Sequence, residues 1–255
     1  METQRRRLRH LHQLHDHIAR NADATPVAAS SSAAEPRRPL AGIRVVELAS
    51  VMAAPVAAAV LADYGAEVIK IEDPRGGDIV RQWGSGDDPD KTADPVLHAT
   101  AEGGGSSFVQ LNRGKKSVAL NPTTPEGKAV LLKLLATADV LVTNVRLRSL
   151  RKAGLDYESV ALLFPELIYA HLSAFGLGGD MVDDPGYDFG AFWAQSGLMD
   201  IVKSGEDAPP PREPGGIGDY NCGRAAYGQC CHSFHLPIAF AALRFIAGHD
   251  TTARG

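Results

Sequence analysis

From Leu40 onward, short apolar segments alternate with longer helical patterns, and this alternation constrains the fold more than any other feature. We predict strands at residues 43–48, 67–71, 117–120, 139–142 and 167–172. Parallel strands need long crossover connections, which are usually helices. The sequence therefore predicts an α/β fold, a doubly wound, mainly parallel sheet of the Rossmann-like type.

Two helices between these strands have clear boundary signals. An alanine-rich segment over residues 55–64 carries Pro55 near its start and Gly65 at its end. A second segment runs to about Leu135, with Thr124 as the expected N-cap and Pro125 in the first helical position. Residues 76–107 form a long segment rich in Gly, Asp and Pro, which predicts a functional or mobile loop. Residues 236–247 are expected to form a buried helix.

The first 40 residues differ in composition from the remainder. They contain seven arginines against four acidic residues, a local charge of +3, which leaves the other residues at −7. We predict that residues 1–40 are a basic, disordered extension and linker, and that residues 41–255 form the folded part. The extension has two interpretations, an organellar presequence or a solvated tail. We accordingly expect a cytoplasmic protein, with a mitochondrial one as the alternative.

Charge and cysteine content exclude several classes of function. The acidic main body argues against nucleic-acid binding, and no apolar run approaches the ~20 residues of a membrane-spanning helix. Three cysteines without CxxC spacing predict neither a disulfide framework nor a structural metal site. We therefore expect no metal, no nucleic acid and no membrane.

The connection between the first predicted strand and helix is a candidate anion site. Unpaired amides and the helix dipole favour a phosphate at such a helix start, beyond the carboxyl end of the strand. Glu72 lies near the spacing of a ribose-binding acid. However, residues 50–55 contain no glycine, so the fingerprint of NAD or FAD binding is missing.

A series of motifs between residues 40 and 228 resembles the family III CoA-transferases, which include formyl-CoA transferase, carnitine CoA-transferase and α-methylacyl-CoA racemase. The motifs occur in the family's order at residues 40–48, 65–72, 77–81, 111–117, 124–127, 139–144, 154–157, 185–188 and 216–219. Typical members are longer and carry a second, smaller domain. The resemblance implies that this sequence covers the N-terminal part of the large domain and stops before the small domain.

Asp219 is the candidate catalytic residue. It follows three glycines within residues 215–218, and such an aspartate is most often a turn residue bonding its own backbone. The resemblance instead identifies it as the nucleophile that forms a covalent aspartyl intermediate while CoA moves from an acyl-CoA donor to a carboxylic acid. The glycines would then let a thioester carbonyl approach the carboxylate and would expose amides to an oxyanion.

Coenzyme A or acyl-CoA is implied as a substrate, with no permanently bound cofactor, and a homodimer is implied for the full family fold. The resemblance and the charges together give candidate CoA-binding residues at Ser50, Val51, Met52, Arg75, Leu120, Asn144, Lys152 and Tyr187. Arg81 is a further phosphate partner on charge grounds, because a guanidinium group forms forked hydrogen bonds with phosphate oxygens.

Two alternatives remain open. A racemase needs two acid/base groups, but Tyr187 occupies the position where the racemase branch has histidine, and His171 would have to substitute. The other alternative is a non-catalytic CoA-binding remnant, because the chain is short. The sequence departs from the family pattern at residues 145–148, at Cys222 and at residues 230–234. We expect Cys222 to be a packing residue.

Overall fold

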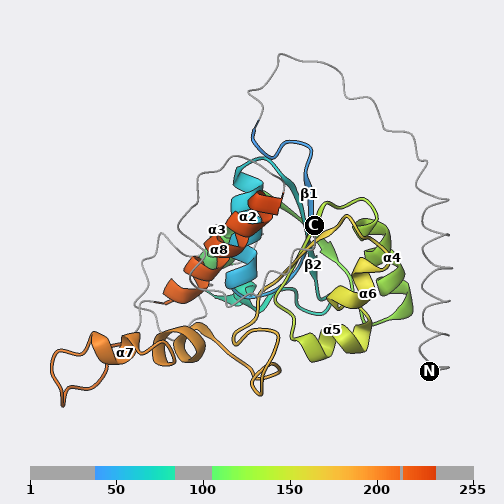
Figure 1. The fold of residues 1–255 in the computed structure, drawn as a ribbon. Coiled ribbons are helices and arrows are strands. Elements are labelled where there is room, and N and C mark those ends of the chain that lie inside the picture. Colours follow the sequence, from blue (N-terminus) through green and yellow to red (C-terminus); the bar gives the residue numbers. More distant parts are fainter. Residues whose placement is uncertain (1–37, 84–104, 213–214, 234–255) are drawn as a thin grey trace.

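The computed structural model describes residues 38–83, 105–212 and 215–233, and all structural statements below concern these residues. Five parallel strands form one sheet in the order β3-β2-β1-β4-β5 (Figure 1). The strands are β1 (Arg44–Leu48), β2 (Glu67–Glu72), β3 (Lys115–Ala119), β4 (Val140–Thr143) and β5 (Ile168–His171). The predicted doubly wound parallel sheet is confirmed.

The strand order reverses between β1 and β4, at the centre of the sheet. The chain passes outward from β1 through β2 to β3 and then returns to β4, so β1 pairs with β2 on one side and with β4 on the other. Val45, for example, lies in register with both Val68 and Val140. Ligands of open α/β sheets bind outside the carboxyl ends of the strands at such a switch point.

Helices cover both faces of the sheet (Figure 1). One face carries α2 (Ala53–Asp63), α3 (Ser106–Asn112) and α8 (Ile217–Ser233), and the other carries α4 (Pro125–Leu135), α5 (Leu147–Ala153) and α6 (Tyr157–Ala161). The core has a corresponding layer on each face. Leu61 and Val68 belong to the layer beneath α2, whereas Leu131 and Leu141 belong to the layer beneath α4.

Both predicted helices are present with the expected boundary signals. The side chain of Thr124 caps α4 by accepting a hydrogen bond from the Gly127 amide at 3.1 Å, and Pro125 is the first helical residue. Helix α2 begins at Ala53, two residues before Pro55. It ends one residue before Tyr64, and Gly65 has a φ of +103°.

Helix α8 (Ile217–Ser233) was not predicted from the sequence, and the predicted glycine-rich turn around Asp219 is wrong. Asp219 lies in the first turn of this 17-residue helix rather than in an open turn, and residues 230–233 continue it. Helix α8 forms because it packs on α2. A Cβ atom at Gly223 would lie 2.6 Å from the Ala53 carbonyl oxygen, so glycine permits this close approach. Glycine disfavours an isolated helix, so tertiary packing outweighs propensity here.

The predicted loop at residues 76–107 contains two short helices in its described parts, η1 (Ile79–Gln82) and the start of α3. After β5, the elements η3 (Phe189–Ala194) and α7 (Leu198–Ile201) project away from the sheet (Figure 1). Of the extension and linker predicted over residues 1–40, residues 1–37 lie outside the described residues, as does the predicted helix at 236–247. The last residue of that prediction, Leu40, is fully buried in the core and so belongs to the folded part. None of the helices in the described ranges is long and apolar enough to cross a membrane.

Candidate functional site

The carboxyl ends of β1 and β4 meet at the switch point, where Asn144 holds the β1–α2 connection. The Ser50 amide donates a hydrogen bond to Asn144 Oδ1 at 3.1 Å, and Asn144 Nδ2 donates to the Ser50 carbonyl at 2.7 Å. Thr143 adds a hydrogen bond of 2.7 Å from its hydroxyl to the Leu48 carbonyl. The structure thus brings two of the predicted CoA-binding residues together.

Val51 adopts a conformation that is unusual for its residue type. Its φ is 69°, and it is the only non-glycine residue in the described part of the chain with a positive φ. A β-branched residue in the left-handed region is strained by about 1–3 kcal/mol, so the surroundings must hold it there. The Val51 amide donates to Asp78 Oδ1 at 3.1 Å, which ties the connection to the loop after β2.

Helix α2 begins directly after this connection and presents its N-terminal amides at the same edge. Met52 is the N-cap residue, it makes no side-chain capping hydrogen bond, and the first turn of α2 contains no acidic residue. The positive end of the helix dipole therefore has no competing carboxylate from its own first turn, which suits a phosphate group.

A buried group of charged side chains lies beneath the connection, and the sequence analysis did not identify it. Lys70 Nζ lies 2.6 Å from Glu47 Oε1 and 3.0 Å from Asp78 Oδ2, and it donates a hydrogen bond to the Ala49 carbonyl at 3.0 Å. Burial alone would lower the pKa of Lys70, but the two carboxylates outweigh it and raise that pKa. Lys70 therefore stays charged in the core.

Lys115 joins the same group from β3. Its Nζ lies 2.6 Å from Glu47 Oε2 and donates to the Pro55 carbonyl at 2.8 Å and to Asn112 Oδ1 at 2.9 Å. Burial lowers the pKa of Lys115 to about 8, and Glu47 opposes this shift. We call Glu47, Lys70, Asp78 and Lys115 the buried ion network.

Asp219 lies beside the β1–α2 connection, although it is far away in sequence. Gly216 has a φ of +81°, and a Cβ atom there would lie 2.4 Å from Met52 Cε, so the chain before α8 packs on Met52. The neighbouring Tyr220 packs against the same apolar cluster as Val51 and Met52. The structure therefore brings the candidate nucleophile and the candidate phosphate site together.

Asp188 is a second carboxylate at this place that the sequence analysis did not single out. Its Oδ2 accepts a hydrogen bond from the Gly218 amide at 3.2 Å, whereas its buried Oδ1 has no hydrogen-bond partner among the described residues. Burial raises the pKa of Asp219 to about 6, and the charge of Asp188 adds to this shift. In the sequence, the only feature that pointed to Asp188 was its place in the motif at residues 185–188.

The predicted role of the glycines needs a correction. Gly218 and Gly223 do not line an open approach to Asp219. A Cβ atom at Gly218 would lie 2.1 Å from Asp188 Oδ1, and one at Gly223 would meet Ala53 and Val56 of α2. Both glycines are therefore packing positions, which allow α8 to lie close to Asp188 and to α2.

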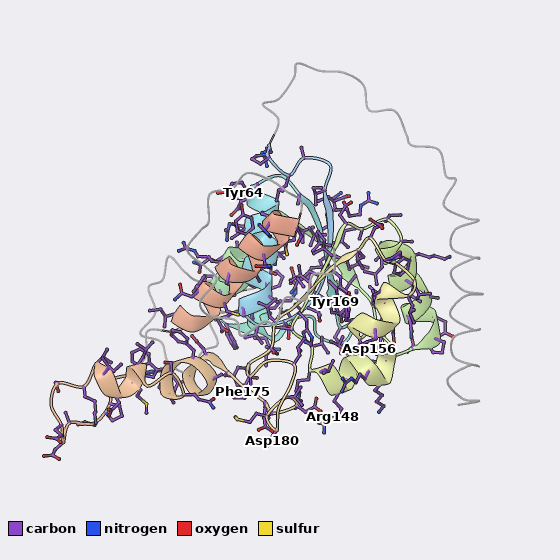
Figure 2. All side chains as sticks on the ribbon, viewed as in Figure 1. Tyr64, Arg148, Asp156, Tyr169, Phe175 and Asp180 are labelled. Carbon is purple, nitrogen blue, oxygen red and sulfur yellow. The ribbon has the colours of Figure 1, made fainter. Side chains whose placement is uncertain are left out.

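The remaining predicted CoA-binding residues lie farther out. Leu120 follows β3 and is partly buried against the core layer under α4, and Lys152 is exposed on α5. Arg75 is exposed and forms an ion pair of 2.7 Å with Asp73. Tyr187 is 71% exposed on the segment after β5, which also carries Phe175 and Asp180 (Figure 2).

Glu72 and Arg81 bond each other instead of facing outward. The Arg81 guanidinium donates two hydrogen bonds to Glu72, at 2.7 and 2.6 Å, and lies over the Phe108 ring. Glu72 also accepts from the Ser117 hydroxyl at 2.6 Å and the Asp78 amide at 3.0 Å. Although burial opposes the shift, these partners lower the pKa of Glu72 to about 2. Its oxygens are thus engaged within the protein, which does not favour a ribose-binding role.

His171 and the cysteines can also be placed. His171 Nε2 lies 2.9 Å from the Val145 carbonyl, and burial lowers the pKa of this histidine. Cys222 is exposed, so the expectation that it is a packing residue was wrong, whereas Cys230 and Cys231 are buried. Within the described ranges, no group of three or more His, Cys, Asp or Glu residues could hold a metal ion.

Comparisons with known proteins identify the family. The sequence matches CoA-transferase family III over residues 40–232. It is 42% identical over 174 residues to the succinate–glutarate CoA-transferase of Agrobacterium fabrum, which covers 67% of this chain and 41% of the relative. It is 37% identical over 182 residues to the cinnamoyl-CoA:phenyllactate CoA-transferase of Clostridium sporogenes, covering 71% of this chain and 42% of the relative.

Solved structures agree. A crystal structure of a CAIB/BAIF family protein from Brucella suis superposes with a TM-score of 0.68 at 34% identity, covering 78% of this chain and 50% of that one. The chain thus spans less than half the length of the two curated relatives above. Because the family match spans residues 40–232, which include the β1–α2 connection and α8 up to His232, the chain belongs to the family III CoA-transferases.

Proposed function

We propose that this protein transfers CoA from an acyl-CoA donor to a carboxylic acid, with Asp219 as the nucleophile. The observation that carries the proposal is the place of Asp219. It is half-buried in the first turn of α8, and the residues on either side of it pack against Met52 and the start of α2. A carboxylate and an anion-binding helix start are thus adjacent, as an acyl-CoA thioester requires.

Coenzyme A would bind along the β1–α2 connection. The amides at the start of α2 would receive phosphate oxygens, while Ser50, Val51 and Met52 would line the path of the molecule. Asn144 would act by fixing Ser50, to which it makes two hydrogen bonds. Further CoA contacts would come from Arg75, Leu120, Lys152 and Tyr187. The exposed pair of Arg75 and Asp73 contributes little stability, so Arg75 can exchange its partner for a phosphate.

The first half of the reaction breaks the donor thioester. A carboxylate oxygen of Asp219 attacks the thioester carbonyl, the C–S bond breaks, and CoA leaves as a thiolate with the electron pair. The product is a mixed anhydride between the acyl group and Asp219. The thiolate then attacks the Asp219 carbonyl carbon, which releases the donor acid as a carboxylate and leaves an aspartyl-CoA thioester.

The second half repeats these steps in reverse order. The incoming carboxylate attacks the aspartyl-CoA thioester, forming a new mixed anhydride and releasing the thiolate. The thiolate attacks the acyl carbonyl of that anhydride, which gives the new acyl-CoA and restores the Asp219 carboxylate. No net proton is consumed, because each step exchanges one anion for another.

The surroundings of Asp219 suit a carboxylate nucleophile. A pKa of about 6 leaves the group mainly ionised at neutral pH. Partial burial removes water that would otherwise stabilise the carboxylate, and a fixed position relative to the CoA site supplies the geometry of attack. Gly218 donates its amide to Asp188, which fixes the beginning of α8 on one side of Asp219.

Racemisation has less support than transfer. Tyr187 stands where a racemase would need a base, and its side chain is exposed. His171 cannot replace it readily, since it already bonds the Val145 carbonyl. The family resemblance further implies a homodimeric assembly.

Calorimetry of the full chain with CoA, followed by exchange between succinyl-CoA and glutarate, tests the proposal. We expect CoA binding in the parent and in Asp219→Asn, but exchange only in the parent, with at least a thousandfold loss in the variant. Asp200→Asn, which changes an exposed aspartate on α7, is the matched control and should keep full exchange. Equal exchange in the parent and Asp219→Asn would exclude Asp219 as the nucleophile. CoA binding with no exchange would favour a non-catalytic CoA-binding module.

A further inference from the structure

Charged side chains hold the β1–α2 connection and the first turn of α2 from below, at three separate backbone groups. Lys70 Nζ donates to the Ala49 carbonyl, the Val51 amide donates to Asp78, and Lys115 Nζ donates to the Pro55 carbonyl. Glu47 lies between the two lysines, 2.6 Å from each. The buried ion network therefore contacts the connection at Ala49 and Val51 and contacts the first turn of α2 at Pro55.

All four side chains of the network are almost completely buried. The exposed fraction is 0% for Glu47 and 1% for Lys70, Asp78 and Lys115. Moving a single charge into a protein interior costs several kcal/mol, and its pairing seldom recovers more than that cost. Apolar side chains of similar volume would fill the same space with less penalty. Stability alone thus gives no reason for four charges here.

The position of these four charges beneath Val51 gives a reason for their presence. Val51 is strained because a β-branched residue occupies the left-handed region, and its amide would be unpaired without Asp78. Asp78 is in turn fixed by Lys70, and also accepts from the Val80 amide at 3.2 Å. A carboxylate fixed by a buried cation is a stiff acceptor that an uncharged side chain cannot easily replace.

We propose that Asp78 is a positioning residue, and that the buried ion network fixes Val51 in its left-handed conformation and so shapes the CoA-binding start of α2. The expected effect of the network on CoA binding rests on the proposed function. Its expected effect on the conformation of Val51 does not. The network does not touch the reacting atoms. It acts through the backbone of residues 49–55.

Hydrogen exchange tests the effect on the backbone without any ligand. In Asp78→Ala we expect the peptide covering residues 49–56 to exchange at least tenfold faster, because Val51 loses its acceptor. Asp78→Asn keeps one acceptor oxygen, so its 49–56 peptide should exchange at a rate between those of the parent and Asp78→Ala. Peptides from α4, on the opposite face of the sheet, should be unchanged. If Asp78→Ala does not fold, Asp78→Asn carries the test alone. Unchanged exchange at 49–56, or equal acceleration in α4, would overturn the proposal.

CoA affinity provides the second test through a double-mutant cycle with Val51→Gly. Glycine adopts a positive φ without strain, so Asp78 should matter less in that background. We expect Asp78→Asn to raise the Kd for CoA about tenfold in the parent and less than about threefold in Val51→Gly. Equal losses in both backgrounds would contradict a role through Val51.

The two tests separate the two proposals. If hydrogen exchange accelerates only at residues 49–56 while no variant and no parent chain binds CoA, the positioning role stands and the proposed function fails. If CoA binds and Asp78→Asn changes neither exchange nor affinity, the proposed function stands and the positioning role fails.

Discussion

The two halves of the candidate site, the β1–α2 connection and the start of α8, differ in how their buried charges are paired. Beneath the β1–α2 connection, each charge of the buried ion network lies against an opposite charge, and Asn144, which follows β4, holds the connection through Ser50. At the start of α8, two carboxylates lie near each other and no cation pairs with either of them among the described residues. One half is electrostatically satisfied and the other is not.

This difference matches the tasks that we propose for the two halves. A binding site for a large anion benefits from a rigid backbone. A backbone that is already ordered loses little conformational entropy on binding, so less of the binding free energy is lost. A nucleophile benefits from the reverse, since a carboxylate that is already saturated by hydrogen bonds is unreactive. Perturbed carboxylates gather at functional sites for this reason.

The largest effect should come from Glu47→Ala. This change leaves Lys70 and Lys115 buried without their shared partner, and we expect the free energy of unfolding to fall by about 3–5 kcal/mol. Urea unfolding monitored by circular dichroism would measure it. Glu166→Ala, at an exposed position, should change stability by less than about 0.5 kcal/mol. A loss at Glu47 as small as that of the control would show that the network is not a coupled unit.

The packing of α8 on α2 should give the next largest effect. In Gly223→Ala, the new Cβ would meet the Ala53 carbonyl oxygen and Val56, so we expect a loss of about 1–3 kcal/mol. Gly228→Ala lies in the same helix with no atom near its Cβ position, and it should stabilise the protein by about 0.5–1 kcal/mol. Thermal unfolding of both variants would compare them. The same sign for both would contradict the close approach of the two helices.

This helix also marks the limit of the sequence analysis. The strands and α2 and α4 could be predicted because their apolar periods, Thr124 and the prolines act locally. Helix α8 could not, because its glycines disfavour a helix locally and are explained only by α2 and Asp188. The buried ion network was missed for a similar reason. Glu47 and Lys70 lie 23 residues apart in the sequence and become neighbours only when β1 pairs with β2 in the sheet.

The smallest effect should be a pH dependence of stability that arises from the burial of Asp219 and from the nearby charge of Asp188. The folded-state pKa of Asp219 is raised from 3.8 to about 6, so the folded protein retains a proton that the unfolded chain releases. Its contribution to stability is complete below pH 4 and is lost as the pH rises to about 6. Because Asp219 is partly exposed, the change should stay below about 1 kcal/mol.

Asp188→Asn removes the neighbouring charge and should lower the pKa of Asp219, so this pH-dependent loss of stability should shrink. Urea unfolding at pH 4, 5 and 6 would compare the parent with the variant. Asp183→Asn changes a carboxylate that accepts from the Arg148 amide instead, and it should leave the slope in place. A steeper slope in Asp188→Asn would contradict the repulsion between Asp188 and Asp219.

The central claim is that the carboxylate of Asp219 becomes acylated. Incubation of the full chain with succinyl-CoA and hydroxylamine, followed by peptide mapping by mass spectrometry, tests it most directly. We predict a hydroxamate on the peptide that contains Asp219, present in the parent and in Asp200→Asn and missing from Asp219→Asn. An unmodified Asp219 peptide from a preparation that exchanges CoA between acids would contradict the claim.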